Sequence, residues 1–200
     1  MVGDAPRIGV LALQGDVREH MRILRRLGAA ARPVRRPAEL AEVDGLVIPG
    51  GESSVIDKLS RAFGMRDPLR REIATGLPVY GTCAGLILLA DEVLDGLAEQ
   101  QSFGGLDVAV RRNAFGSQLD SFESDLRVDA FGGPPVKAVF IRAPVVERVG
   151  AGVEILATLD DGRVVAVEQG NLLGTSFHPE VSNETRFHER LLERVRARLN

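Results

Sequence analysis

The one cysteine of this 200-residue chain, Cys83, stands in a setting that favours a reactive thiol. It lies in Gly81-Thr82-Cys83-Ala84-Gly85, after the apolar run 78–82, which predicts a buried strand, and before a helix-favouring run that reaches Ala90. Glycines two positions to either side of a residue on a strand-to-helix turn are typical of a nucleophile elbow. Taken alone, a single cysteine in an apolar region is more often a small buried side chain.

A thiol nucleophile requires a general base, and three histidines are available: His20, His178 and His188. His178 follows a predicted strand and precedes Pro179, which favours extended backbone at the histidine. In extended backbone, residues i and i+2 point to the same side, so we expect Glu180 to orient the imidazole of His178. The competing interpretation is a turn before a helix, with the glutamate near the helix N-terminus. His20 and His188 fall in predicted helices and are expected to be surface or packing residues.

Acyl transfer at a thiol also requires hydrogen-bond donors for the oxyanion that forms. At an elbow, the backbone N–H of Ala84 is placed for this task. A second donor is expected from Gly51, in the Gly50-Gly51 pair that follows a predicted strand. The commoner use of two adjacent glycines is a tight turn, and this alternative stays open here. The sequence holds no phosphate-loop pattern.

The elements that must position these residues alternate along the first half of the chain. Predicted strands cover 7–13, 31–35, 45–48 and 78–82, and predicted helices cover 17–27, 53–63 and 68–75, with a short helical turn after Pro37. This order predicts an α/β fold with a central, mostly parallel, flavodoxin-like sheet flanked by helices. Sites in such sheets lie at the carboxyl ends of the strands. The turns at 14–16, 49–53 and 81–85 should therefore share one rim.

The second half of the chain has a different pattern. Short β-rich runs predict additional antiparallel strands at 108–111, 126–128, 136–142, 155–159, 164–168 and 172–177. Asp160-Asp161-Gly162 and Gln169-Gly170-Asn171 are typical of hairpin turns. A last helix is expected over 183–199, with Phe187, Leu191 and Val195 on one stripe. No linker-like stretch divides the chain, so residues 1–200 are predicted to form one domain.

Composition narrows the function classes. The net charge is −3, from 25 basic and 28 acidic residues, and no basic excess suggests a nucleic-acid partner. No apolar stretch is long enough to cross a bilayer. One cysteine cannot form an internal disulfide and no signal peptide is visible, so a cytoplasmic location is expected. Three histidines and one cysteine, far apart in the sequence, predict no metal site.

Several motifs together resemble the class I, or triad, glutamine amidotransferases and, within them, the glutaminase subunits of pyridoxal 5'-phosphate synthase. The likeness spans nearly the whole chain. The residues that carry it are Leu11 to Asp16, Pro49 to Ser54, Gly81 to Ala90, Arg112 to Gly116, Asp120 to Glu123, Phe140 to Pro144 and Phe177 to Glu180.

The resemblance implies an enzyme that hydrolyses L-glutamine to L-glutamate and ammonia, with no metal or organic cofactor. It implies Cys83 as nucleophile, His178 as base and Glu180 as orienter. Contacts to glutamine are implied from Gly51, Glu52, Ser53, Arg112, Ile141 and Arg142. An arginine suits the α-carboxylate of glutamine, so Arg112 and Arg142 are the natural candidates.

The resemblance also implies a partner. The ammonia would pass to a synthase subunit that builds pyridoxal 5'-phosphate, within a hetero-oligomeric complex. Because Gln14 and Asp16 share the predicted rim, we expect these two residues and Arg18 near the interface.

Two alternatives remain open on the sequence. One is an amidotransferase subunit of the same class that feeds ammonia to another synthase. The other is a non-catalytic scaffold on the same fold, with Cys83 as a redox-sensing thiol, since fold alone does not determine function.

Overall fold

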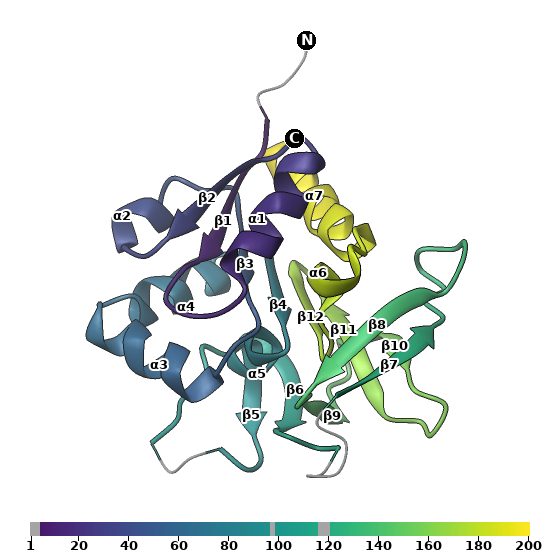
Figure 1. Cartoon of the computed structure of the whole chain (residues 1–200). Helices are drawn as coiled ribbons and strands as arrows, with labels where there is room; N and C mark the ends of the chain where they lie inside the picture. The colour runs from purple at the N-terminus through teal and green to yellow at the C-terminus, as the bar shows by residue number, and fades with distance from the viewer. Residues whose placement is uncertain (1–4, 97–98, 116–120) are drawn as a thin grey trace.

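The computed structural model describes residues 5–96, 99–115 and 121–200 (Figure 1). Gly116 to Asp120, which carry part of two motifs named above, lie outside the described residues. The strands are β1 (Arg7–Leu11), β2 (Ala30–Val34), β3 (Gly45–Ile48), β4 (Val79–Thr82), β5 (Ala90–Val93), β6 (Leu106–Arg111), β7 (Ser121–Leu126), β8 (Val136–Ile141), β9 (Val145–Val149), β10 (Glu154–Thr158), β11 (Val164–Gln169) and β12 (Leu172–Thr175). The helices are α1 (Val17–Arg26), α2 (Pro37–Leu40), α3 (Ser53–Ala62), α4 (Arg66–Ala74), α5 (Ala84–Leu89), α6 (Pro179–Ser182) and α7 (Arg186–Leu199).

Ten strands form the central sheet in the order β2-β1-β3-β4-β12-β11-β9-β6-β5, with β10 paired to β11. The run from β2 to β12 is parallel, and the pairs of β11 with β12, of β9 with β11 and of β6 with β9 are antiparallel. The order β2-β1-β3-β4 is the flavodoxin-like order of a doubly wound sheet. The expected α/β fold, with a mostly parallel core and added antiparallel strands, is therefore confirmed.

Two apolar layers cover the sheet. One layer packs the sheet against α2, α3, α4 and α5 through residues such as Leu40, Ile56 and Leu69. The other packs it against α1, α7 and the separate two-stranded sheet β7-β8, through Leu24, Phe187 and other residues. In Figure 1 the β7-β8 sheet lies on the same side as α6, apart from α2, α3 and α4. The strands at the centre read as continuous apolar runs because both of their faces are buried.

The expected stripe on the last helix is confirmed, since Phe187, Leu191 and Val195 are all buried. Both predicted hairpin turns join antiparallel neighbours, with Gly162 and Gly170 at positive φ. Three strands were missed: β5, β7 and β9. The apolar run after Cys83 was read as one helix to Ala90, but the chain leaves α5 at Leu89 and continues as β5 without a turn.

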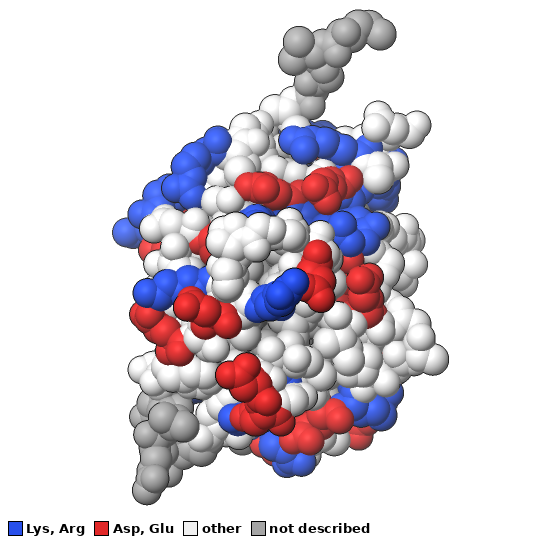
Figure 2. Space-filling view, turned by 90° about the vertical axis from the view of Figure 1, so that its right-hand side faces the viewer, with Lys and Arg blue, Asp and Glu red and all other residues white. Residues whose placement is uncertain are grey.

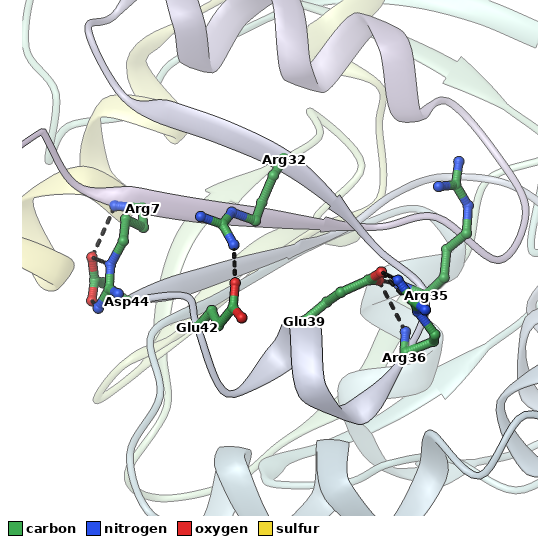
Figure 3. Close-up of polar contacts among 7 residues, drawn as sticks. All are labelled: Arg7, Arg32, Arg35, Arg36, Glu39, Glu42 and Asp44. Atoms are coloured by element: carbon green, nitrogen blue, oxygen red, sulfur yellow. Dashed lines mark hydrogen bonds and ion pairs between the residues drawn. The ribbon is translucent and has the colours of Figure 1, made fainter.

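Charged side chains protect the edge strand β2. Arg32 forms an ion pair with Glu42, and Arg36 binds Glu39 of the neighbouring helix α2 (Figure 3). Arg7 binds Asp44 at 2.6 Å, across the amino ends of β1 and β3. Charged residues along an exposed sheet edge discourage pairing with another chain.

Acidic and basic side chains are interspersed on the face seen in Figure 2, with no broad patch of one sign. This distribution agrees with the nearly balanced charge of the sequence. Within the described residues, no helix combines the length and the apolar character needed to span a bilayer.

Substitution of Phe187 tests how much the aromatic cluster beneath α7 contributes to stability. It is fully buried and contacts the rings of Tyr80, Phe131 and Phe177. Phe187→Ala should lower the free energy of unfolding by about 3–5 kcal/mol, because it leaves a cavity among these rings. Chemical denaturation measures the loss.

The matched control is Phe63, which is 60% exposed. Phe63→Ala should change the same free energy by less than about 0.5 kcal/mol. Equal losses for the two variants would contradict this assignment of the core.

Candidate active site

Cys83 occupies a strained turn between β4 and α5. Its φ is +49° and its ψ is −101°, a conformation that a non-glycine residue adopts only when its surroundings impose it. The N–H of Cys83 donates to the carbonyl of Thr175 at 2.7 Å, which ties the turn to β12. The elbow expected from the sequence is therefore present.

This turn requires glycine at two positions, because neither has room for a Cβ atom. A Cβ at Gly81 would lie 2.5 Å from the carbonyl carbon of Gly85. A Cβ at Gly85 would overlap the backbone carbonyl of Ile48, at the end of β3. The elbow is thus packed directly on the neighbouring strand end.

His178 lies beyond the end of β12, at the N-terminus of the short helix α6. Its Nδ1 is 2.7 Å from Oε1 of Glu180, and its backbone N–H donates to the carbonyl of Val139. Both side chains are buried, at 5% and 0% exposure. Pro179 is the first residue of α6, so Glu180 lies in its first turn. The predicted contact is present, although the glutamate reaches the imidazole from a helical turn instead of an extended segment.

Two carboxylates lie near the same nitrogen, Nδ1, of the His178 imidazole. Besides Glu180, Oδ2 of Asp16 lies 3.5 Å from Nδ1 of His178. Burial by itself lowers the pKa of His178, but hydrogen bonds to Asp16, Cys83 and Glu180 outweigh burial and raise it from 6.5 to about 12. Burial raises the pKa of Glu180, and its hydrogen bond to His178 opposes that rise. The imidazole is therefore the group that holds the proton.

The same acids make the only candidate metal cluster found among the described residues. Ligand atoms of Asp16, His178 and Glu180 lie within 4.8 Å of one another, although the sequence spacing predicted no such cluster. His178 Nδ1 and Glu180 Oε1 are already joined by the 2.7 Å hydrogen bond. Two of the three candidate ligand atoms are therefore already paired with each other.

The end of β1 and the loop after β3 close around His178. Gly50 faces the imidazole, since a Cβ there would lie 2.9 Å from Nδ1 of His178. Gln14 accepts a hydrogen bond from the N–H of Glu52 at 2.8 Å. The N–H of Asp16 donates to the carbonyl of Gly50 at 3.2 Å. The turns expected on one rim are in direct contact.

The candidate oxyanion donors lie on the two turns that meet here. Ala84 is the first residue of α5 and is buried, and its N–H belongs to the first turn of that helix, which has no partner within the helix. Gly51 has φ +155°, and a Cβ there would overlap Oε1 of Gln14. A larger residue here would displace the end of the Gln14 side chain, and the positive φ favours glycine.

A polar cluster joins three of the candidate substrate residues. Arg112 donates to Glu52 at 2.9 Å and to Gln100 at 2.8 Å, and Gln100 donates to Ser53 at 2.9 Å. The side chain of Arg112 is 13% exposed, so it is mostly buried within this cluster. Gln100 was not expected from the sequence, because it lies in a loop with no motif.

Ile141 and Arg142 approach the cysteine from the end of β8. The sulfur of Cys83 lies 3.9 Å from the carbonyl oxygen of Ile141. Arg142 is exposed and has φ +42°. Among the described non-glycine residues, positive φ occurs at Cys83, Arg142, Asn113 beside Arg112, and Asn183. Three of these four strained positions therefore surround the candidate site, as is common at functional sites.

Of the two alternatives expected for His20 and His188, the structure shows packing and not the surface. Both are fully buried, and Nδ1 of His20 lies 2.8 Å from Nε2 of His188. His20 lies one helical turn after Asp16 on α1, and this i, i+4 spacing was the signal that it faces the same site. Of the expected interface residues, Gln14 and Asp16 belong to this site, and Arg18 is exposed on α1.

Comparison with solved structures shows which class of protein has this fold. A crystal structure described as a glutamine amidotransferase superposes with a TM-score of 0.87 at 48% identity, covering 94% of this chain and 98% of that chain. A second crystal structure, of a glutamine amidotransferase from Thermotoga maritima, shares the fold at a TM-score of 0.63 and 16% identity, covering 98% and 85% of the two chains. The fold is that of the class I glutamine amidotransferases.

Comparison with sequences then gives the family. The model of the SNO glutamine amidotransferase family matches residues 10–197. A pyridoxal 5'-phosphate synthase subunit PdxT from Clavibacter michiganensis is 66% identical, over 96% of this chain and 92% of that protein. The subunit of the same name from Streptomyces coelicolor is 59% identical, over 98% and 96%. This chain belongs to the SNO glutamine amidotransferase family, which confirms the resemblance inferred from its motifs.

The charge state of His178 gives a prediction. Its raised pKa means that its stabilising contribution is complete below a pH of about 6.5 and is lost as the pH rises toward about 12. The imidazole should therefore stay protonated through the neutral range, as measured by its NMR chemical shifts. Glu180→Gln removes a buried negative charge and should lower that pKa.

Glu184→Gln is the matched control, because Glu184 pairs with Arg186 and not with His178. It should leave the titration of His178 unchanged. A midpoint near the ordinary 6.5 in the unaltered protein would refute the proton assignment.

Proposed function

We propose that this chain is the glutaminase subunit of pyridoxal 5'-phosphate synthase. It hydrolyses L-glutamine to L-glutamate and ammonia, and it delivers the ammonia to a synthase subunit in a hetero-oligomeric complex. The observation that carries the proposal is the buried Cys83, His178 and Glu180 arrangement at one strand-end rim, in a chain 66% identical to a PdxT subunit. Residues 1–200 act as one amidotransferase domain, and the reducing cytoplasm suits its free thiol.

The proposed reaction begins with the proton on His178. The Cys83 thiolate attacks the side-chain carboxamide carbon of glutamine, and the oxyanion is held by the N–H groups of Gly51 and Ala84. His178 gives its proton to the nitrogen, the C–N bond breaks, and ammonia leaves. Glu180 keeps the imidazole in position throughout.

The second half of the reaction restores the starting state. Neutral His178 takes a proton from water, and the hydroxide attacks the γ-glutamyl thioester on Cys83. The C–S bond breaks, glutamate leaves, and the thiolate faces an imidazolium again. Glutamine and water have become glutamate and ammonia, with no oxidant, metal or organic cofactor needed.

Substrate recognition is assigned to the surrounding loops. Arg112 binds the α-carboxylate of glutamine, since its guanidinium is already oriented by Glu52 and Gln100. Gly51, Glu52 and Ser53 hold the substrate on one side. Ile141 and Arg142 hold it on the other side, because this segment lies beside the cysteine sulfur.

The proposed interface with the synthase includes Gln14, Asp16 and Arg18. Gln14 and Asp16 contact the loop and the histidine of the site, so a partner seated on this rim would adjoin the place where ammonia is released. The solvent face of α1 continues the surface with exposed Arg18, Arg22, Arg25 and Arg26. An acidic surface on the synthase fits this face.

Activity measured with and without the synthase tests the function. The mixture should hydrolyse glutamine and form pyridoxal 5'-phosphate from glutamine. Cys83→Ala should abolish both activities while product formation from added ammonium salts persists, because only the ammonia source is lost. Glutamine hydrolysis by Cys83→Ala, or equal stimulation by an unrelated synthase, would refute the proposal.

Two neighbouring arginines, Arg112 and Arg111, provide a matched test of how glutamine is bound. Arg112→Gln should raise KM for glutamine about ten-fold or more, with a smaller effect on kcat, because a charge-assisted contact to the carboxylate is lost. Arg111 is exposed and pairs with Glu147, so Arg111→Gln should change KM less than about two-fold. Equal effects of the two substitutions would refute the role of Arg112.

A further inference from the structure

A chain of buried polar groups lies behind Glu180, and the reaction described above does not use it. Nε2 of His20 is 3.6 Å from Oε2 of Glu180 and 3.3 Å from the hydroxyl of Thr82, the residue before the cysteine. Nδ1 of His20 is 2.8 Å from Nε2 of His188. All four residues are fully buried, and they come from α1, β4, α6 and α7.

Two atoms in this chain of contacts have no hydrogen bond within the described part of the protein. They are Oε2 of Glu180 and Nδ1 of His188. A buried carboxylate oxygen without a donor is costly, and a buried N–H without an acceptor is costly as well. The tautomers of the two histidines decide whether Oε2 of Glu180 receives a donor and whether Nδ1 of His188 carries a hydrogen.

Only two neutral arrangements are compatible with the contact between His20 and His188. In the first, Nδ1–H of His20 donates to His188. Nε2 of His20 then accepts from the hydroxyl of Thr82 but also turns its lone pair toward the carboxylate of Glu180, and His188 is left with an unpaired N–H. In the second, Nε2–H of His188 donates to His20. His20 then presents its own Nε2–H to the hydroxyl of Thr82 and the carboxylate of Glu180, and His188 keeps only an unpaired acceptor.

The second arrangement is favoured, because it places a donor before the negative carboxylate and leaves no buried N–H unpaired. The 3.6 Å separation shortens to a hydrogen bond with a movement of about 0.5 Å. Such contacts are often long before substrate binds.

Both imidazoles are neutral, as this arrangement requires. Burial, together with the nearby His188 and His178, lowers the pKa of His20 well below 6.5. Burial lowers the pKa of His188 to about 3. The titratable and charged groups that face this pair are Arg26, Tyr80, His178, Glu180 and Glu184, and Asp16 and Cys83 lie beyond them, beside His178.

We propose that His20 is a positioning residue for Glu180. Its neutral imidazole donates from Nε2 to Oε2 of Glu180, and so directs the other oxygen, Oε1, at His178. His188 fixes the tautomer of His20. This inference deepens the proposed glutaminase function and rests on it, because its kinetic test needs glutamine turnover.

Two substitutions separate a positioning role from simple packing. His20→Phe keeps the ring volume and removes the donor, whereas His20→Gln keeps an amide N–H near the position of Nε2. With the synthase present, His20→Phe should lower kcat about ten-fold or more, the value of one hydrogen bond to a charged group. KM should change little. His20→Gln should recover most of kcat.

The pH profile is the readout that packing alone does not move. A carboxylate that loses a donor becomes easier to protonate, so the acidic limb of kcat should shift upward by about one pH unit in His20→Phe. His20→Gln should keep the limb of the unaltered protein. The control is Leu24→Val, one turn further along α1 and fully buried, which should change stability without moving the limb.

The tautomer itself is measured without any turnover. In 15N NMR spectra of the full chain at neutral pH, His20 should be a neutral imidazole protonated at Nε2. Protonation at Nδ1, a charged His20, or an unmoved acidic limb in a folded His20→Phe protein would each overturn the inference. If the unaltered complex fails to hydrolyse glutamine, the proposed function fails, and the tautomer still decides whether His20 donates to Glu180.

Discussion

The site depends on backbone segments that lie too close together to admit a side chain between them. Gly85 rests on the carbonyl of Ile48, Gly50 faces the imidazole of His178, and Gly15 meets the carbonyl of Gly50. These contacts bring the carboxyl ends of β1, β3 and β4 to van der Waals distance. The strained φ of Cys83 follows, because the turn has no other path between Gly81 and Gly85.

The second constraint on the site is the charge of the side chains that meet there. An imidazolium enclosed by protein is expensive unless carboxylates compensate it, and here Glu180 and Asp16 both do. The raised pKa of His178 means that this imidazole carries a positive charge beside the two carboxylates in the neutral range. Only one oxygen of the buried Glu180, Oε1, contacts His178. The second oxygen, Oε2, has no hydrogen bond among the described residues and is free to accept one from a neighbouring element.

The sequence predicted most of the site because glycines and the paired His178 and Glu180 leave a local signal. It predicted the parallel core because continuous apolar runs mark doubly buried strands. It missed β7 because only two of the six residues in that strand, Phe122 and Leu126, are apolar, and its exposed side chains include Glu123 and Asp125.

Tertiary packing was invisible to the sequence for a different reason. His20 sits in a strongly amphipathic helix where a histidine suits the surface, and it is buried because α1 packs against β4, α6 and α7. The strain at Asn113 and Arg142 has no local cause, since it comes from loops held by the sheet. The role of Gln100 was equally hidden in the sequence, because its two partners, Ser53 and Arg112, lie on separate segments.

The depth of the cysteine has a consequence for the lifetime of the protein. Cys83 is only 6% exposed and lies against the carbonyl of Ile141. Oxidation and alkylation of a thiol depend on access as well as on nucleophilicity. A sulfur buried to this degree should react slowly with bulky electrophiles. Steric shielding would thus protect the one thiol of the chain from modification between rounds of use.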